Sequence, residues 1–264
     1  MNKTIMAITA AMLITTSVLA QKQTKPWKEW TRKDAEKILN DSPWSQTQTE
    51  TESSQATETG RNFGDTRGRE EAVTSVAGSA SVKFHVRFYS ARPVRQAYVR
   101  MIELSDTPPD QAAAERMNAW ANLAADDRII VAVSFEGSDK RYLSRVARAF
   151  SSSTTPALKD TVYLERKDGK RVFLSEYVPP SKDAFGARFI FPRTVDGQPF
   201  ITPDSSMIRF HAEYDPKIPD ASKAVAQASS TSAGSTTRTE NPFKLKLDMK
   251  FKVAEMNYNG ELEY

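Results

Sequence analysis

Apolar and polar side chains alternate in two long runs of the chain. The first contains Val82, Phe84, Val86 and Phe88, interleaved with Lys83, His85 and Arg87. In the second, apolar residues from Phe243 to Val253 interleave with lysines and one aspartate. A period of two places successive side chains on opposite faces of a strand. Each run therefore predicts a β-strand with one buried face and one polar face.

Four further stretches predict strands. RIIVAVSF, residues 128–135, is apolar on both faces, which is typical of a central strand. TVYLERKDGKRVFLSEY, residues 161–177, predicts a hairpin that turns at Asp168-Gly169. ARFIFPR and MIRFHAEY, residues 187–193 and 207–214, add two more strands.

Helical periodicity appears in three places between these strands. The apolar sets are Val94, Ala97, Tyr98, Met101 and Ile102, then Ala113, Met117, Trp120 and Ala124, then Leu143, Val146, Ala147 and Phe150. Together the elements predict an α+β domain over residues 81–264, with about three packed helices. A crossover from the first strand through the helix pair to the central strand is one arrangement, so the sheet is expected to be mixed or antiparallel.

A short helix is predicted ahead of this domain, in residues 21–44. Thr31 and Asp34 have the spacing of a capping box, and the residues after Leu39 read Asn-Asp-Ser-Pro, which ends a helix. The helix has about two turns and is too short to be stable alone. We therefore expect it to need a surface on which to dock.

Three of the four tryptophans, Trp27, Trp30 and Trp44, lie in this same segment. One interpretation is that they are buried and dock the helix onto the domain, because each buried tryptophan removes a large apolar area from water. The other is that they form an exposed aromatic arm that binds a sugar polymer, a membrane interface or a partner groove. The capping and stop signals favour docking.

Two stretches are poor in apolar residues. Residues 45–80 are rich in Thr, Gln, Glu and Ser and are predicted to be a polar linker. The alternation of Thr47, Thr49 and Thr51 leaves open a polar edge strand at its start. Residues 215–241 are predicted to be a polar, disordered insertion in the domain.

The first twenty residues, MNKTIMAITAAMLITTSVLA, have the pattern of an export signal. One lysine precedes an apolar run, and Val18-Leu19-Ala20 suits a signal peptidase. We predict a bacterial signal peptide at residues 1–20, cleaved after Ala20, and a secreted or periplasmic protein with no transmembrane segment after cleavage. The run is shorter than a typical span of about 20 residues. An uncleaved anchor is the alternative interpretation.

Composition narrows the classes of partner. The chain has no cysteine, so an exported protein of this sequence relies on its core and not on disulfides. Its 37 Lys and Arg against 33 Asp and Glu give a net charge of +4. This mild excess favours an anionic envelope component or a protein partner. It is too small to indicate nucleic-acid binding.

Two basic surfaces are candidate binding sites. Arg141, Arg145 and Arg148 share the polar face of the third helix, and Arg92 and Arg95 could extend that face into an anion-binding patch. The last strand carries a face that is almost wholly lysine. Lysines often mark the edge of a sheet, where charge blocks further pairing. For the arginines of the third helix, the alternative is an ordinary solvated surface. For the lysines of the last strand, the alternative is a basic face that meets an anionic partner.

Catalytic motifs are missing from the sequence. There is no cysteine nucleophile, nucleophile elbow, zinc-protease motif, phosphate-binding glycine loop or calcium loop. Carboxylate pairs of the glycosidase type leave no short signature. His85, His211 and Glu213 lie on polar strand faces and would form a metal site if their strands were neighbours in register. Otherwise they are ordinary solvent-facing residues, and we expect no cofactor.

Three stretches together resemble an uncharacterised family of bacterial secreted proteins. They are KPWKEWTRKDAEKILNDSPW, with its W-x-x-W, DAxxIL and SPW elements, VKFHVRFYSARPVRQA, and FKLKLDMKFKVAEMNYNGELEY. The resemblance covers most of the chain apart from the two polar stretches. It implies export and a single architecture, and it implies no activity, ligand or catalytic residue.

Two functions remain open from the sequence. The favoured one is an exported, non-enzymatic binding or interaction domain that uses a basic or aromatic surface. The alternative is an exported hydrolase that uses carboxylates or a sparse His/Glu metal site. Convergence of His85, His211 and Glu213 in a cleft would favour the hydrolase.

Overall fold

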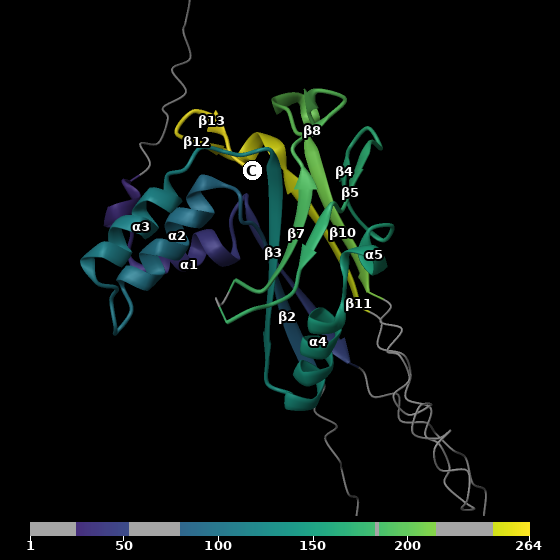
Figure 1. Ribbon diagram of the computed structural model, residues 1–264, viewed down its shortest axis with the longest axis horizontal. Helices are drawn as coiled ribbons and strands as arrows, with labels where there is room; N and C mark the ends of the chain where they lie inside the picture. Colours follow the sequence, from purple (N-terminus) through teal and green to yellow (C-terminus); the bar gives the residue numbers. More distant parts are fainter. Residues whose placement is uncertain (1–24, 53–79, 183–184, 215–244) are drawn as a thin grey trace, which may run out of the picture.

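The computed structural model describes residues 25–52, 80–182, 185–214 and 245–264. Two antiparallel sheets face each other, and a group of helices lies on one side (Figure 1). The predicted signal peptide, most of the predicted linker and the predicted insertion lie outside the described residues. No helix in the described ranges is long and apolar enough to cross a membrane.

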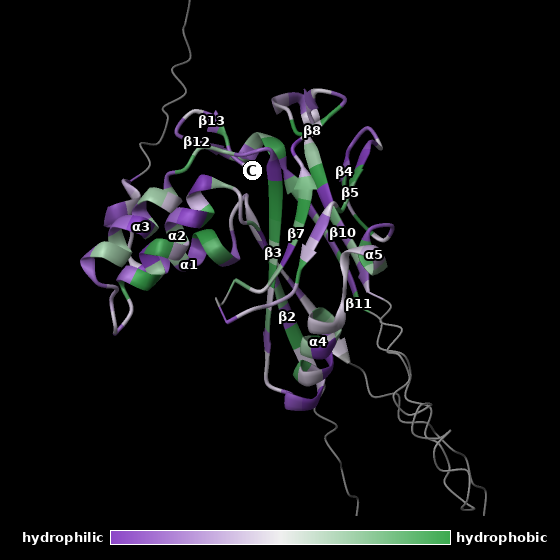
Figure 2. Ribbon diagram, in the orientation of Figure 1, coloured by the Kyte–Doolittle hydropathy of each residue, from purple (hydrophilic) through white to green (hydrophobic). Residues whose placement is uncertain are grey.

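The first sheet has five strands in the order β1-β2-β3-β7-β6. They are β1 (Ser45–Glu52), β2 (Ala80–Phe88), β3 (Arg128–Gly137), β7 (Ala187–Pro192) and β6 (Glu176–Val178). As its apolar sequence predicts, β3 is the central strand, and it is largely hydrophobic in Figure 2. Ile129, Val131 and Val133 on this strand are fully buried.

The second sheet has four strands in the order β11-β10-β4-β5. They are β11 (Leu245–Lys252), β10 (Met207–Tyr214), β4 (Val162–Arg166) and β5 (Arg171–Phe173). The hairpin predicted at Asp168-Gly169 joins β4 to β5, with Gly169 at a φ of +83°. The lysine-rich β11 is an edge strand, which is the position that its lysines predicted.

The core lies between the two sheets and is rich in aromatic rings. Phe88 of β2 meets Phe251 of β11 edge to face, with 4.9 Å between ring centroids. Helix α4 (Lys140–Ser152) extends the core beyond the strands, because its Phe150 stacks on Tyr214 at 4.8 Å and on Phe84 at 6.3 Å. In the hydropathy view the hydrophobic colour follows these inner strands (Figure 2).

On one long side the chain itself joins the two sheets. It leaves β5 at Phe173 and enters β6 at Glu176 through only Leu174 and Ser175. The Leu174 amide donates to Val162 in the four-stranded sheet, and the Ser175 amide donates to Ile190 in the five-stranded sheet. A single extended segment therefore passes directly from one sheet to the other.

A helical layer covers part of the five-stranded sheet. Helix α1 (Arg32–Asn40) packs on α2 (Arg92–Glu103), which packs on α3 (Gln111–Ala121) (Figure 1). The smaller elements are η1 (Trp27–Glu29), α5 (Thr155–Leu158), β8 (Thr194–Val195), β9 (Gln198–Pro199), η2 (Pro203–Ser205), η3 (Val253–Glu255), β12 (Asn257–Tyr258) and β13 (Glu261–Leu262). Five α-helices among the described residues and antiparallel sheets confirm the predicted α+β class.

Two predictions about chain organisation are wrong. The strands β2 and β3 are antiparallel neighbours, with Phe88 opposite Val131. The segment that contains α2 and α3 therefore connects two adjacent antiparallel strands and is not a crossover between parallel strands. The predicted linker 45–80 begins with strand β1, paired to β2 along its whole length. The edge-strand alternative was correct, and the polar composition suits a strand at the margin of a sheet.

Candidate functional site

The tryptophan-rich segment is docked on the domain. Trp30 and Trp44 are only 7% and 5% exposed. Thr31 and Asp34 form the predicted capping box, with the Thr31 amide donating to Asp34 at 2.8 Å. These hydrogen bonds from Thr31 lower the pKa of the Asp34 carboxyl. The exposed-arm interpretation is wrong for Trp30 and Trp44, because buried rings offer no face to a ligand.

Hydrogen bonds attach this segment at several points. The Arg100 guanidinium on α2 donates to the Trp30 carbonyl at 2.7 Å. The indole of Trp44 donates to the Glu263 carbonyl at 2.8 Å. Trp27 is the one tryptophan of the three that keeps a partly exposed ring, and the Lys28 ammonium lies 4.2 Å from its centroid. The segment is therefore part of the folded body.

The predicted metal site does not form. His85 lies on β2 of the five-stranded sheet, while His211 and Glu213 lie on β10 of the four-stranded sheet. Their strands are not neighbours, because β2 pairs with β1 and β3, and β10 pairs with β4 and β11. Within the part of the chain that the structure describes, no group of three ligand-type side chains could hold a metal ion.

Each histidine has its own structural contacts. His85 Nδ1 lies 2.9 Å from the Thr47 hydroxyl, and burial lowers its pKa. His211 stacks on Tyr163, with 4.7 Å between ring centroids, and lies 3.7 Å from Asp248. Burial lowers the pKa of His211 as well, while Asp248 opposes that shift. Both rings connect neighbouring strands of their own sheets.

The arginine patch is smaller than the sequence suggested. Arg141 and Arg148 are exposed on α4 and Arg145 is half-buried there. Arg92 and Arg95 lie on α2 in a different part of the molecule (Figure 1). Arg92 is ion-paired to Glu263 at 2.6 Å, and Arg95 is buried and donates to the Leu123 carbonyl. The predicted extension of the patch is therefore wrong.

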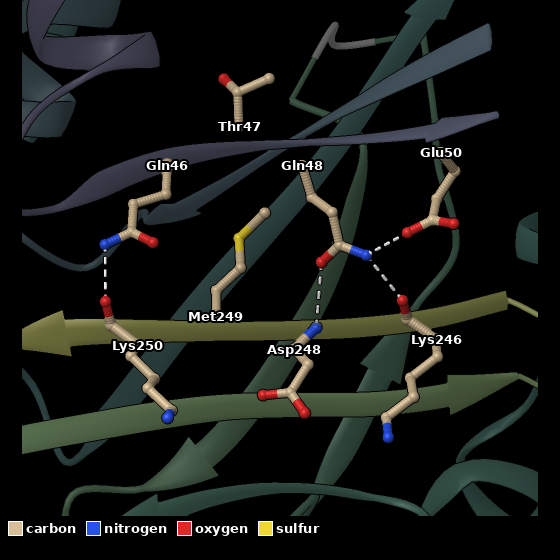
Figure 3. A pocket seen from close by; sticks show the side chains of 8 residues that line it. All are labelled: Gln46, Thr47, Gln48, Glu50, Lys246, Asp248, Met249 and Lys250. Atoms are coloured by element: carbon tan, nitrogen blue, oxygen red, sulfur yellow. Dashed lines mark hydrogen bonds between the residues drawn. The ribbon is translucent and has the colours of Figure 1, made fainter.

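Sequence reasoning missed a seam where β1 and β11, the edge strands of the two sheets, meet through side chains (Figure 3). The carboxamide of Gln48 donates to the Lys246 carbonyl at 2.8 Å and accepts from the Asp248 amide at 3.1 Å. Gln46 donates to the Lys250 carbonyl at 2.6 Å. Side-chain amides thus satisfy backbone groups on the edge of β11.

An open groove of about 770 Å³ follows this seam. It is lined by Gln46, Thr47, Gln48, Glu50, Lys246, Asp248, Met249 and Lys250. In Figure 3 the Met249 side chain rises between the two glutamines, while Lys246, Asp248 and Lys250 point away from β1. We call this feature the seam groove. Its lining combines amides, ammonium groups and one apolar side chain.

The charges around the seam groove are unequally paired. Arg209 donates to both carboxylate oxygens of Asp248 and reaches Glu165 at 3.1 Å. These bonds lower the pKa of Asp248. Lys246 and Lys250 are exposed, and no carboxylate among the described residues lies within ion-pair distance of either ammonium group. The two lysines therefore give the groove a positive flank, with Glu50 at one end.

One sequence signal pointed toward this site. The sequence predicts the lysine face of β11, but Gln46 and Gln48 lie in a stretch that it predicts mainly as linker. Their spacing of two places both side chains on one face of β1. Only the fold brings that face to β11, about 200 positions further along the chain.

Comparison with protein-family models, with curated proteins and with solved structures finds no match. The resemblance to uncharacterised bacterial secreted proteins stays a prediction from three sequence stretches. Function is therefore inferred from the geometry and charge of this chain.

Proposed function

We propose that the protein is an exported, non-enzymatic binding protein that holds an anionic partner in the seam groove. The observation that carries the proposal is the pair of exposed ammonium groups on Lys246 and Lys250, neither of which has a carboxylate within ion-pair distance in the described part of the chain. An open groove beside exposed positive charge is an electrostatic site for a ligand of opposite sign.

The sequence supports the location. Residues 1–20 have the order of a signal peptide, with one lysine, an apolar run and a small-residue cleavage site. A cysteine-free chain with an extensive aromatic core suits export without disulfides. An anionic envelope component or an acidic protein partner would both be available in that setting.

The alternative, an exported hydrolase, has less support. His85 and His211 are held in different sheets, so they offer no joint site. A carboxylate that acts as general acid needs a raised pKa. Arg171 and Arg209 lower the pKa of Glu165, and Arg209 lowers that of Asp248. These carboxylates are suited to stabilising the sheet surface.

The test is co-sedimentation of residues 21–264 with bacterial envelope fractions at about 0.05 M and about 1 M salt. We expect binding at low salt that weakens at high salt. Replacing both seam lysines, Lys246→Gln with Lys250→Gln, should weaken low-salt binding about five- to tenfold. The matched control is Lys33→Gln with Lys37→Gln, because these two lysines are also exposed and lie on α1, away from the seam.

The α4 arginines provide a further comparison. If Arg141→Gln with Arg148→Gln abolishes binding while the seam variant binds like wild type, the partner uses α4 and the seam proposal is wrong. Absence of binding at either salt concentration would also contradict it. The proposal is supported if envelope binding weakens in the seam variant and not in the α1 or α4 variants.

A further inference from the structure

We infer that the partner is an extended acidic peptide segment that adds as a strand to the free edge of β11. This inference rests on the proposed function and names its class of partner. It makes the seam groove a site of strand addition, in which backbone hydrogen bonds give affinity and side chains give selectivity.

The edge of β11 that faces β1 has side-chain partners but no strand paired to it. In the described structure β11 pairs only with β10. Backbone groups of successive residues in a strand point to opposite sides. The glutamine contacts show that the backbone groups of Lys246, Asp248 and Lys250 point away from β10. Lys246, Asp248 and Lys250, which are every second residue of β11, thus present their amides and carbonyls at the edge that faces β1.

Gln48 already imitates the ligand that we infer. Its planar carboxamide gives one donor and one acceptor to β11, at the Lys246 carbonyl and the Asp248 amide. A residue on a parallel neighbouring strand would use the same two groups in the same sense. Among the described residues, no hydrogen bond joins the Asp248 carbonyl or the Lys250 amide to β1. A peptide would satisfy these groups and replace the carboxamide.

The pattern of donors and acceptors favours a peptide over another polyanion. The edge offers amide donors and carbonyl acceptors in alternation, so a complementary ligand needs both along its length. A phosphate or sulfate polymer supplies mainly acceptors. A peptide backbone supplies both at the spacing of a strand.

The lysines specify acidic side chains on that peptide. Lys246 and Lys250 are separated by four positions and therefore share the outer face of β11. A bound strand would place alternate side chains on this same face, next to the two ammonium groups. Opposite charges at neighbouring cross-strand positions stabilise pairing. The ligand should therefore carry Glu or Asp at alternate positions.

The probe is a synthetic peptide of about eight residues, a common strand length, in which glutamate alternates with valine. Binding to residues 21–264 is measured by isothermal titration calorimetry at low salt. Two further peptides have the same side chains and charge, but each is N-methylated at alternate backbone nitrogens. One set of methyl groups blocks one edge of the peptide strand, and the other set blocks the opposite edge.

Strand addition predicts that methylation of the pairing edge weakens binding at least about tenfold, because several backbone hydrogen bonds are lost. Methylation of the opposite edge should change affinity less than about twofold. If both methylated peptides bind as well as the parent peptide, charge alone holds them and the inference is overturned. These comparisons use the wild-type protein, so no variant has to fold.

A protein variant tests the competition by Gln48. Gln48→Ala frees the Lys246 carbonyl and the Asp248 amide, so the parent peptide should bind about five- to tenfold more tightly. Thr49→Ala is the control, because Thr49 is the adjacent β1 residue, on the opposite face of the strand, and is exposed. Weaker or unchanged binding by Gln48→Ala, with its folding verified by thermal unfolding, would contradict displacement.

The outcome separates this inference from the proposed function. If no peptide binds while envelope binding still depends on Lys246 and Lys250, the strand inference falls and the binding function stands. If neither the peptides nor the envelope fraction binds, both fall. Both are supported if methylation of one peptide edge alone weakens peptide binding and envelope binding depends on Lys246 and Lys250.

Discussion

The indole Nε1 of Trp44 donates a 2.8 Å hydrogen bond to the carbonyl of Glu263, which lies 219 residues later in the chain. The ring also meets Tyr258 edge to face, with 6.2 Å between centroids. Tyr258 in turn donates from its hydroxyl to Gln96 on α2 at 2.8 Å. These contacts join the tryptophan-rich segment, the β12–β13 ribbon and the helical layer.

Replacing Trp44 by phenylalanine should therefore destabilise the whole protein. Trp44→Phe leaves the Glu263 carbonyl without its buried donor and removes part of a packed ring, which should cost about 2 kcal/mol or more. Urea unfolding would measure the loss. Trp27→Phe is the control, because Trp27 is only partly buried, and should cost less than about 1 kcal/mol. Equal losses would contradict this role for Trp44.

Arg87 should prove essential for docking α1. Its buried guanidinium donates to the Leu39 carbonyl, to Asn40 Oδ1 at 2.9 Å and to Ser134 Oγ at 2.6 Å. Lysine cannot reproduce this fork, so Arg87→Lys should cost about 2 kcal/mol or more. In Arg87→Lys, amide hydrogen exchange in α1 should be faster than in wild type, while exchange in the central strand β3 should change much less.

The control for Arg87 is Lys83→Gln, on the same face of β2 but exposed. It should leave exchange in α1 unchanged. Similar exchange in α1 for wild type and Arg87→Lys would show that the helix is held by its apolar face alone.

The Asp248–Arg209 pair should make stability depend on acid pH. The folded-state pKa of Asp248 is lowered by Arg209, so its stabilisation is complete above the unfolded pKa of about 3.9 and is lost as pH falls through the folded pKa. Wild type should be more stable than Asp248→Asn near pH 6, and the difference should shrink below about pH 4.

Urea midpoints measured between about pH 2 and 7 would reveal this convergence. Asp106→Asn is the control, since Asp106 is exposed and has no ion pair within the described ranges. A difference between wild type and Asp248→Asn that stays constant across the range would contradict the linkage.

Two glycines with similar backbone angles should respond differently to substitution. Gly186 has a φ of +82°, and an added Cβ would lie 2.2 Å from the Val133 carbonyl oxygen. Gly169 has a φ of +83° but has no atom within 4 Å of that position. Gly186→Ala should cost more than about 2 kcal/mol, and Gly169→Asn about 1 kcal/mol or less. Comparable losses in thermal unfolding would argue against the close contact with β3.

The positions of the strands could be predicted from the sequence better than which strands pair with each other. The bounds of β10 match the predicted residues 207–214, because apolar and polar side chains alternate along the strand. The pairing of β10 with β4 and β11 depends on contacts across the whole chain, so the proposed convergence of His85 and His211 had no local signal to correct it. The capping box of α1 was predictable because both partners lie within one turn.

Strand β1 shows why the candidate site was harder to predict. An edge strand with few buried apolar side chains has the composition of a linker, and the alternating threonines were its one local signal. The roles of Gln46 and Gln48 become apparent only when β11 lies opposite them. The lysines of β11 were evident in the sequence, but the groove beside them was not.

The two long sides of the sandwich differ in mechanical strength. At one side, covalent backbone through Leu174 and Ser175 links the sheets. At the other, the described polar links are three hydrogen bonds that involve the side chains of Gln46 and Gln48, two donated by them and one accepted by Gln48. A force that separates the sheets would break these weak bonds first and leave the covalent side intact. The two sheets would then separate by rotating about the β5–β6 junction, which would act as a hinge.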